Sequence, residues 1–218
     1  MDLNLFETEV LVTAHDTMPY RLLRPQHQEP GKKYPLVIFL HGSGERGTDN
    51  KKQLRYMAPV FLDSSNRAGY NCFVLAPQCK PGVYWGGVSR PLIELMNQTI
   101  DSNEVDTDRI YVIGLSMGGY GVWWLMSKFP NKFAAAIPIC GGGDTKWAAR
   151  IKTIPTWAFH GAKDLTVKPE QSRRMVAAIK QAGGSPLYTE YATVGHNSWV
   201  SAFREPDLLP WLFSKKLQ

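Results

Sequence analysis

The stretch Gly114-Leu115-Ser116-Met117-Gly118-Gly119 decides how this chain folds. It follows the apolar segment 109–113 and precedes a helix-like segment at 120–126. A G-x-S-x-G sequence between a strand and a helix is typical of a nucleophile elbow, a sharp turn that holds a serine away from the backbone. Glycines are needed beside that serine because side chains there would collide with the adjoining strand and helix. The stretch therefore predicts a strand, a tight turn that carries Ser116, and a helix.

Apolar runs that alternate with helix-like segments predict the strands of an α/β fold. Continuous runs of this kind are typical of strands buried on both faces of a parallel sheet; they are 36–40, 72–76, 110–113, 134–139 and 156–159. Segments 7–13 and 20–24, with a turn at 15–17, predict an antiparallel hairpin at one edge, and the more polar segment 187–191 predicts a last strand. The sequence thus predicts a three-layer α/β/α sandwich with a mostly parallel eight-stranded sheet.

Helices are expected in the segments between these strands. They are residues 51–62, a helix with Ser89 as its N-cap, the helix after Ser116 that ends near Phe129, a helix opened by Pro169 and closed by Gly183-Gly184, and residues 207–215. Only residues 140–155 connect two of the strands at the point where lids are usually inserted. We therefore expect no substantial lid and an open site.

The composition is that of an ordinary globular protein. The chain has 218 residues, of which 44% are hydrophobic and 20% charged, and we expect residues 1–218 to form a single catalytic domain. No apolar run approaches the roughly 18 residues of a membrane span. The N-terminus lacks the features of a signal peptide, so the compartment stays open: secreted or periplasmic if a leader was removed, otherwise cytoplasmic.

The net charge is +6, which raises the question of a nucleic-acid partner. The lysines and arginines are scattered, however, and no aromatic residues interleave with them. We therefore interpret the charge as a solvated basic surface and expect no nucleic-acid partner. The sequence leaves the oligomeric state open, with a monomer among the possibilities.

The three cysteines, Cys72, Cys79 and Cys140, do not form a metal-binding pattern. Cys72 and Cys79 flank an expected strand, which would keep them too far apart for a disulfide. Free thiols are the expectation, and they weakly favour a reducing compartment.

Ser116 can act as a nucleophile only if a base removes its proton and a third group orients that base. In this architecture the chain order is serine, acid, histidine. His196 lies on a loop after the last strand, where an imidazole can reach the carboxyl edge of the sheet, and we identify it as the base. The other histidines are expected at the surface or in hydrogen bonds that shape loops: His15, His27, His41 and His160.

The acid is expected in the loop after the strand before last. Asp164 occupies this loop, and its carboxylate would orient the imidazole and stabilise the imidazolium. Asp144, which follows the preceding strand, is the alternative, because the acid occupies that position in some hydrolases. Its other interpretation is a turn residue after Gly141-Gly142-Gly143. We favour Asp164.

Acyl transfer also needs hydrogen-bond donors for the developing oxyanion. One is expected to be the backbone N–H of Met117, directly after the nucleophile. The other is expected from the glycine-rich loop 41–47, at the N–H of Ser43 or, as the alternative, of Gly44. This loop lacks the glycine patterns of phosphate-binding loops, which argues against a nucleotide site.

Together these motifs resemble the α/β-hydrolase superfamily over essentially the whole chain. Segments 41–47, 76–79, 114–119 and 195–199 are similar to the small serine esterases of the phospholipase/carboxylesterase or "predicted peptidase" type, with acetyl-xylan and feruloyl esterases as near relatives. Dienelactone hydrolases are similar in size but use a cysteine nucleophile, which Ser116 argues against. The resemblance implies a serine carboxylic-ester hydrolase without a metal or organic cofactor.

Aromatic residues near the motifs are expected to line the substrate pocket. Trp85 and Trp199 are placed to do so, and Gly42 lets the backbone approach a substrate. Trp123, Trp124 and Trp157 lie inside expected elements and are predicted to be core residues. Aromatic walls suit a short acyl chain, a sugar face or an aromatic acid, and we expect a short-chain acyl or carbohydrate-linked ester as the substrate.

Two other functions are compatible with the same residues. The first is a serine peptidase or amidase that uses the same triad, and the second is a non-catalytic binding module on a hydrolase scaffold. A binding module would be expected to lack a triad member, whereas all three positions are filled here.

Overall fold

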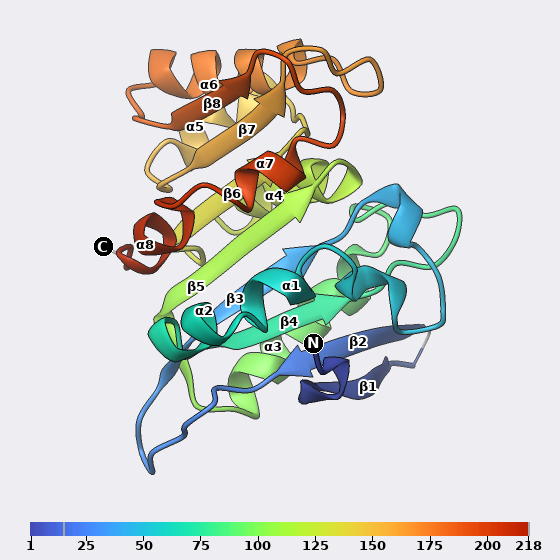
Figure 1. Ribbon diagram of the computed structural model, residues 1–218. Helices are drawn as coiled ribbons and strands as arrows, with labels where there is room; N and C mark the ends of the chain where they lie inside the picture. The colour runs from blue at the N-terminus through green and yellow to red at the C-terminus, as the bar shows by residue number, and fades with distance from the viewer. Residues whose placement is uncertain (15, 218) are drawn as a thin grey trace.

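The chain folds around an eight-stranded sheet with the strand order β1-β2-β4-β3-β5-β6-β7-β8 (Figure 1). The computed structural model describes residues 1–14 and 16–217, so His15 lies outside the described residues. The strands are β1 (Phe6–Val12), β2 (Thr17–Leu23), β3 (Tyr34–Leu40), β4 (Phe73–Pro77), β5 (Val105–Leu115), β6 (Ala135–Ile139), β7 (Trp157–Gly161) and β8 (Leu187–Tyr191).

β2 runs antiparallel to both of its neighbours, and all the other adjacent pairs are parallel. The predicted fold class, a mostly parallel sheet with an N-terminal antiparallel hairpin, is therefore confirmed. β5 is much longer than the predicted strand 110–113 because it continues along β3, where Val105 pairs with Tyr34. The first half of β5 contains polar residues, so this part of the strand does not form an apolar run in the sequence.

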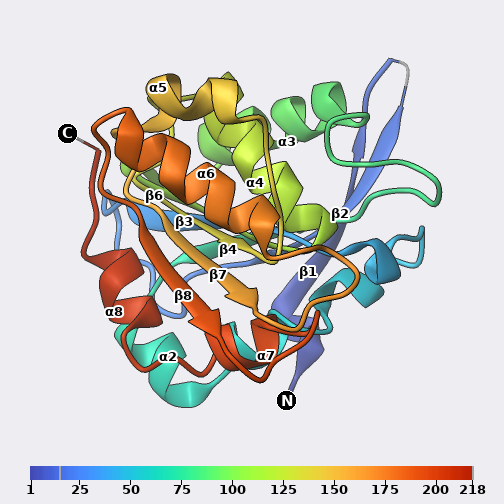
Figure 2. The same cartoon turned by 90° about the horizontal axis from the view of Figure 1, so that it is seen from above.

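Helices cover both faces of the sheet (Figure 2). One face carries α3 (Ser89–Asp101), α4 (Met117–Lys128), α5 (Ala148–Ile151) and α6 (Glu170–Gln181), and the other carries α1 (Ala58–Phe61), α2 (Ser64–Gly69), α7 (Trp199–Ala202) and α8 (Leu208–Phe213). Short 3₁₀ helices are η1 (Leu3–Leu5), η2 (Ser43–Glu45), η3 (Lys52–Leu54) and η4 (Thr145–Trp147).

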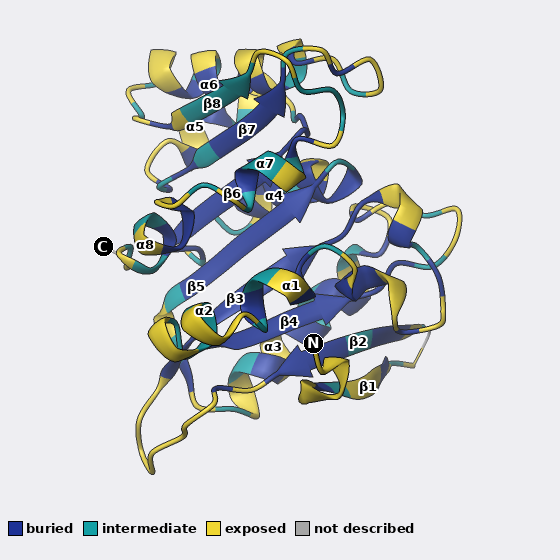
Figure 3. Cartoon of the chain, in the orientation of Figure 1, coloured by how far each residue is buried: buried dark blue, intermediate teal, exposed yellow. Residues whose placement is uncertain are grey.

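The core lies in two layers, one on each side of the sheet. Along β3, Leu36 and Ile38 pack with α3 and α4, whereas Val37 and Phe39 pack with α1 and α8. This alternation follows from the two-residue period of a strand. Figure 3 shows the central strands buried, the edge strands β1 and β8 more exposed, and the outer faces of the helices exposed.

Two helix predictions were wrong in detail. The segment 51–62 is not one helix but η3 followed by α1. Pro59 lies in the first turn of α1, and its missing N–H prevents a continuous helix through this point. Ser89 is not an N-cap: the Val88 carbonyl already accepts a hydrogen bond from the Leu92 N–H at 3.1 Å, so the helix begins one residue earlier than its predicted cap implies.

The carboxyl ends of the parallel strands meet at one edge of the sheet, and the loops there carry the candidate site. Between β6 and β7 only η4 and α5 intervene, which agrees with the expected absence of a substantial lid. In the part of the chain that the structure describes, no helix combines the length and the apolar character needed to cross a bilayer.

Candidate active site

Ser116 lies on the turn between β5 and α4, in a backbone conformation that serine rarely adopts. Its φ is 52° and its ψ is −114°. The conformation is fixed from both sides, because the Ser116 N–H donates to the Ile139 carbonyl at 2.9 Å and the Ser116 carbonyl accepts from the Tyr120 N–H at 3.1 Å. Such a residue costs about 1–3 kcal/mol and persists only where its surroundings enforce it.

The glycines of the motif are required by close backbone contacts. A Cβ on Gly118 would lie 1.8 Å from the Leu40 carbonyl oxygen, and a Cβ on Gly114 would lie 2.3 Å from the Gly118 oxygen. Helix α4 therefore packs directly against the backbone of β3 and β5. This packing aims the Ser116 side chain at the carboxyl edge of the sheet.

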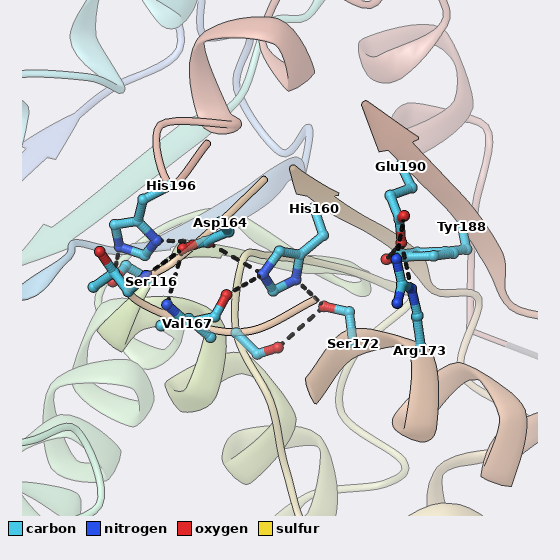
Figure 4. A network of polar contacts seen from close by, with 11 residues as sticks. Ser116, His160, Asp164, Val167, Ser172, Arg173, Tyr188, Glu190 and His196 are labelled. Atoms are coloured by element: carbon cyan, nitrogen blue, oxygen red, sulfur yellow. Dashed lines mark hydrogen bonds and ion pairs between the residues drawn. The ribbon is translucent and has the colours of Figure 1, made fainter. Parts of the chain in front are cut away.

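Ser116, His196 and Asp164 form one hydrogen-bonded chain (Figure 4). Ser116 Oγ lies 2.9 Å from His196 Nε2, and His196 Nδ1 lies 2.7 Å from Asp164 Oδ2. A carboxylate beside Nδ1 assigns the proton to that nitrogen and leaves Nε2 free to accept the serine proton. The structure thus brings together the three residues named from the sequence.

The Asp164 carboxylate is buried and held in its charged form. Burial alone would raise its pKa, but the hydrogen bond from His196 and the backbone N–H groups of Val167 and Thr166 keep the pKa below its ordinary value. The alternative acid, Asp144, is exposed and caps η4 through the Lys146 N–H at 2.9 Å. It makes no contact with His196, so its role is that of a turn residue.

The two residues proposed to supply the oxyanion donors line the same cavity as Ser116. Met117 is the first residue of α4, and Ser43 is the first residue of η2. Both residues line this cavity together with Ser116. Because the first amides of a helix have no acceptor within it, both N–H groups are available to a substrate oxygen.

His41 shapes the loop that carries Ser43. Its Nε2 accepts from the Cys79 N–H at 2.9 Å, so its Nδ1–H donates to the Gly42 carbonyl at 2.6 Å. The Trp85 indole N–H donates to the His41 carbonyl at 3.0 Å. Burial lowers the pKa of His41 to about 4, so this ring stays neutral and acts as a fixed part of the loop.

His160, at the end of β7, is a second imidazole on the Asp164 carboxylate that the sequence did not assign to the site. Its Nε2 lies 2.8 Å from the Val167 carbonyl and 3.2 Å from Asp164 Oδ2, and its Nδ1 lies 2.7 Å from Ser172 Oγ on α6 (Figure 4). Burial lowers the pKa of His160, so the ring is neutral. The Nε2–H then faces the carboxylate, and Ser172 Oγ lies within hydrogen-bond distance of both His160 Nδ1, at 2.7 Å, and the Gly141 carbonyl oxygen, at 3.0 Å. A signal was present, because His160 ends the strand before this loop and precedes Asp164 by only four residues.

An ion pair outside the site fixes α6 to β8. Arg173 donates to both oxygens of Glu190, at 2.8 and 2.6 Å. Arg173, together with the Tyr188 hydroxyl, lowers the pKa of Glu190 to about 2. The pair joins α6, the helix that carries Ser172, to β8, the strand that precedes the His196 loop.

Cys140 is another neighbour that the sequence did not place near the site. Its sulfur, a nitrogen of His196 and an oxygen of Asp164 lie within 4.8 Å of one another, the spacing of a metal site. Burial raises the pKa of the Cys140 thiol to about 12, whereas a metal binds the thiolate. Asp164 and His196 are also bonded to each other. The group therefore fits a protonated thiol packed beside the triad better than a metal centre.

A cavity of about 880 Å³ opens beside Ser116. Its lining residues are mainly aromatic and small, with two arginines: Ser43, Arg46, Tyr84, Trp85, Gly86, Ser116, Met117, Tyr120, Gly121, Trp124, Gly142, Gly143, Asp144, Thr145, Trp147, Thr166, Val167 and Arg174. Trp85 lies in this wall as predicted, although it is almost completely buried.

Three predictions about the pocket need correction. Trp199 does not line the cavity; its ring packs edge-on against His196 with the centroids 5.5 Å apart. Gly42 also lies outside the lining, because it is buried against the Leu115 side chain. Trp124 is a cavity residue rather than a core residue. It shares one face of α4 with Met117, at the seven-residue spacing that returns to the same side of a helix.

A serine on such a turn, above the carboxyl edge of this sheet, defines the α/β-hydrolase fold. Residues 88–157 match the prolyl oligopeptidase family, a span that contains Ser116 but ends before Asp164 and His196. A solved structure of a thermostable esterase superimposes with a TM-score of 0.93 and 38% identity, covering 98% of this chain and 64% of that one.

Two curated relatives carry different activities in their names. A bifunctional acetylxylan esterase/xylanase of Neocallimastix patriciarum is 32% identical over 63% of this chain. "Probable dipeptidyl-peptidase 5" of Aspergillus terreus is 27% identical over 66% of this chain. The chain spans only 20% and 22% of the length of these two proteins. The predicted resemblance to the α/β-hydrolase superfamily is thereby confirmed, and the proteins similar to this chain include esterases and peptidases.

Proposed function

We propose that this protein, as a single catalytic domain, hydrolyses carboxylic esters through an acyl-enzyme on Ser116. The observation that carries the proposal is the hydrogen-bonded chain from Ser116 through His196 to the buried Asp164. A serine in a strained conformation, an imidazole with its free nitrogen on the hydroxyl, and a charged carboxylate are the parts that nucleophilic acyl transfer requires.

In the first half of the reaction, Ser116 Oγ attacks the ester carbonyl carbon while His196 Nε2 takes the hydroxyl proton. The carbonyl oxygen becomes an oxyanion, which the N–H groups of Met117 and Ser43 stabilise. Asp164 stabilises the imidazolium that forms. His196 then donates the proton to the alcohol oxygen, the carbon–oxygen bond breaks, and the acyl group remains on Ser116.

In the second half, water replaces the alcohol. His196 removes a proton from the water, whose oxygen attacks the acyl carbon and forms a second oxyanion in the same position. Collapse of this intermediate returns the proton to Ser116 and releases the carboxylic acid. All of these steps use groups of the protein and one water molecule, so the proposal needs neither a metal nor an organic cofactor.

We propose short-chain acyl or carbohydrate-linked esters as substrates. The rings of Tyr84, Tyr120, Trp124 and Trp147 in the cavity wall offer flat apolar surfaces that suit an acyl chain or the face of a sugar ring. The similarity to a thermostable esterase and to an acetylxylan esterase supports an ester rather than an amide.

A peptidase is the second candidate, because the prolyl oligopeptidase family and a dipeptidyl peptidase match this chain. Amide cleavage uses the same triad but needs stronger protonation of the leaving nitrogen. Matched p-nitrophenyl ester and p-nitroanilide substrates with the same acyl group separate the two candidates. The esterase proposal predicts turnover of the ester and little or none of the anilide.

The direct test is the Ser116→Ala variant. It is expected to lose hydrolysis of p-nitrophenyl acetate and labelling by a fluorophosphonate probe, while its circular dichroism melting curve shows a folded protein. Ser198→Ala serves as a control, since Ser198 is a buried serine outside the hydrogen-bonded chain. Unchanged turnover in Ser116→Ala would rule out the proposed nucleophile, and absence of labelling in the wild type would favour a binding module.

A further inference from the structure

Arg46 lies in the wall of the Ser116 cavity without a partner for its charge. Its Nε and Nη2 are buried and have no hydrogen-bond acceptor. In the part of the chain that the structure describes, its guanidinium forms neither an ion pair nor a side-chain hydrogen bond. Buried polar groups are satisfied in the great majority of cases, so an unsatisfied guanidinium that lines the same cavity as the nucleophile requires an explanation.

The neighbouring groups hold Arg46 in place without neutralising it. Its guanidinium stacks on the exposed ring of Tyr84, with the Arg46 Cζ 4.6 Å from the ring centroid. The adjacent Glu45 is buried and forms no ion pair with it among the described residues; burial raises the pKa of Glu45. Stacking on an aromatic ring fixes the plane of the guanidinium and supplies no acceptor for its N–H donors.

The other charges of the cavity are already engaged or lie at its rim. Arg174 is exposed and its Nη2 lies 3.3 Å from the Gly143 carbonyl oxygen. Asp144 is exposed and caps η4. Arg46 lines one cavity with Ser116 and with Ser43, whose N–H is the proposed oxyanion donor, so a substrate that fills this cavity could contact all three.

We propose that the cavity takes esters that carry a carboxylate group, and that Arg46 binds this carboxylate. The inference rests on the proposed function and narrows its substrate class. A planar guanidinium matches a carboxylate through two parallel N–H···O bonds. One guanidinium neutralises one charge, which favours a carboxylate over a doubly charged phosphate in a cavity with mainly aromatic walls. The carboxylate could lie on the acyl or on the alcohol side of the ester.

Two matched pairs of substrates distinguish these sides. Mono-p-nitrophenyl glutarate against p-nitrophenyl pentanoate tests an acyl-side carboxylate, and 4-acetoxybenzoate against its methyl ester tests an alcohol-side carboxylate. For each pair the ratio of kcat/KM, charged over neutral, is measured in 0.05 and 0.5 M NaCl. High salt removes attraction that comes only from the overall positive charge of the protein.

The wild type is expected to prefer the charged ester in at least one pair, and this preference is expected to persist in high salt. In Arg46→Gln the ratio should fall about 10- to 100-fold, the loss that removal of a hydrogen bond to a charged group produces. Arg46→Lys keeps the positive charge but not the pair of parallel N–H donors of a guanidinium, so its ratio should fall less than that of Arg46→Gln. The matched control is Arg55→Gln, because Arg55 also stacks on a tyrosine, Tyr56, but does not line the cavity; its ratio should not change.

Two results would overturn the inference: no preference in either pair, or the same ratio in the wild type and in Arg46→Gln. If neutral esters are hydrolysed in that case, the esterase proposal stands and only the substrate class falls. If the wild type hydrolyses none of the four esters, the esterase proposal falls by itself. In that case the binding of glutarate to the wild type and to Arg46→Gln is measured through the fluorescence of the cavity tryptophans. The inference is overturned if the two proteins bind glutarate equally well or if neither binds it.

Discussion

Replacement of His160 by asparagine is expected to slow ester hydrolysis about tenfold, although His160 does not contact Ser116 or the cavity. The reason is the Asp164 carboxylate. Its Oδ2 accepts from His196 Nδ1 at 2.7 Å and lies 3.2 Å from His160 Nε2. His160 therefore fixes the position of the oxygen that in turn orients His196, and we regard it as a positioning residue.

The magnitude follows from the geometry of this contact. A hydrogen bond to a charged group contributes about 1.5–3 kcal/mol. The bond to Asp164 is long, and its donor is shared with the Val167 carbonyl at 2.8 Å, so the lower end of the range applies. A loss of about 1.4 kcal/mol in transition-state stabilisation corresponds to about a tenfold lower rate. The unpaired Val167 carbonyl would cost about 1–3 kcal/mol of stability and lower Tm by about 2–10 °C.

Two variants separate positioning from simple destabilisation. Asparagine has a short side chain that can satisfy Ser172 but leaves Asp164 without this donor. Glutamine is longer and can place its amide nitrogen near the position of Nε2. His160→Asn is expected to lower kcat about tenfold with little change in KM, and His160→Gln to stay within about threefold of the wild type.

The assay is the hydrolysis of p-nitrophenyl acetate at 25 °C, with circular dichroism melting to show that each variant is folded at that temperature. Equal losses of kcat in His160→Asn and His160→Gln would refute the positioning role. A folded His160→Asn variant with the kcat of the wild type would refute it as well.

Two further predictions concern the scaffold around the site. Gly118→Ala should destabilise the protein by more than about 3 kcal/mol, because the new Cβ would lie 1.8 Å from the Leu40 carbonyl oxygen. Gly69→Ala is the control: a Cβ at Gly69 would have no atom within 4 Å, so Tm should stay almost unchanged. Similar melting temperatures for the two variants would contradict the close packing of α4. His41 should stay neutral on acidification, since burial lowers its pKa from the ordinary 6.5 to about 4. Between these pH values the unfolded chain binds a proton that the folded chain does not, so His41 should account for a loss of about 3 kcal/mol of stability as the pH falls from 6.5 to 4. Urea unfolding across this range measures the loss, and a ring that titrates near pH 6.5 by NMR would contradict the assignment.

The fold and the hydrogen-bonded chain of the site could be predicted because both depend on local patterns. Buried parallel strands are continuous apolar runs, and the turn at Ser116 needs glycines at fixed spacing, so both leave a direct trace in the sequence. Asp164 and His196 follow from chain order, since each lies in a loop at the carboxyl edge of the sheet. The helix ends were predicted less well because Pro59 and the turn before Ser89 act through hydrogen bonds that no residue pattern shows.

The walls of the cavity could not be predicted because they depend on the direction of side chains from distant segments. Trp199 is only three residues from His196, yet its ring packs behind the imidazole instead of in the cavity. Trp124 has the apolar surroundings of a core residue in the sequence, but the pitch of α4 turns it toward the cavity. In the sequence, Arg46 is one of 25 basic residues. Only its place beside Tyr84, without an acceptor, sets it apart. Local patterns thus predict the reaction that the site can perform. The choice of substrate depends instead on packing between distant segments, and Arg46 is the residue that we propose to determine it.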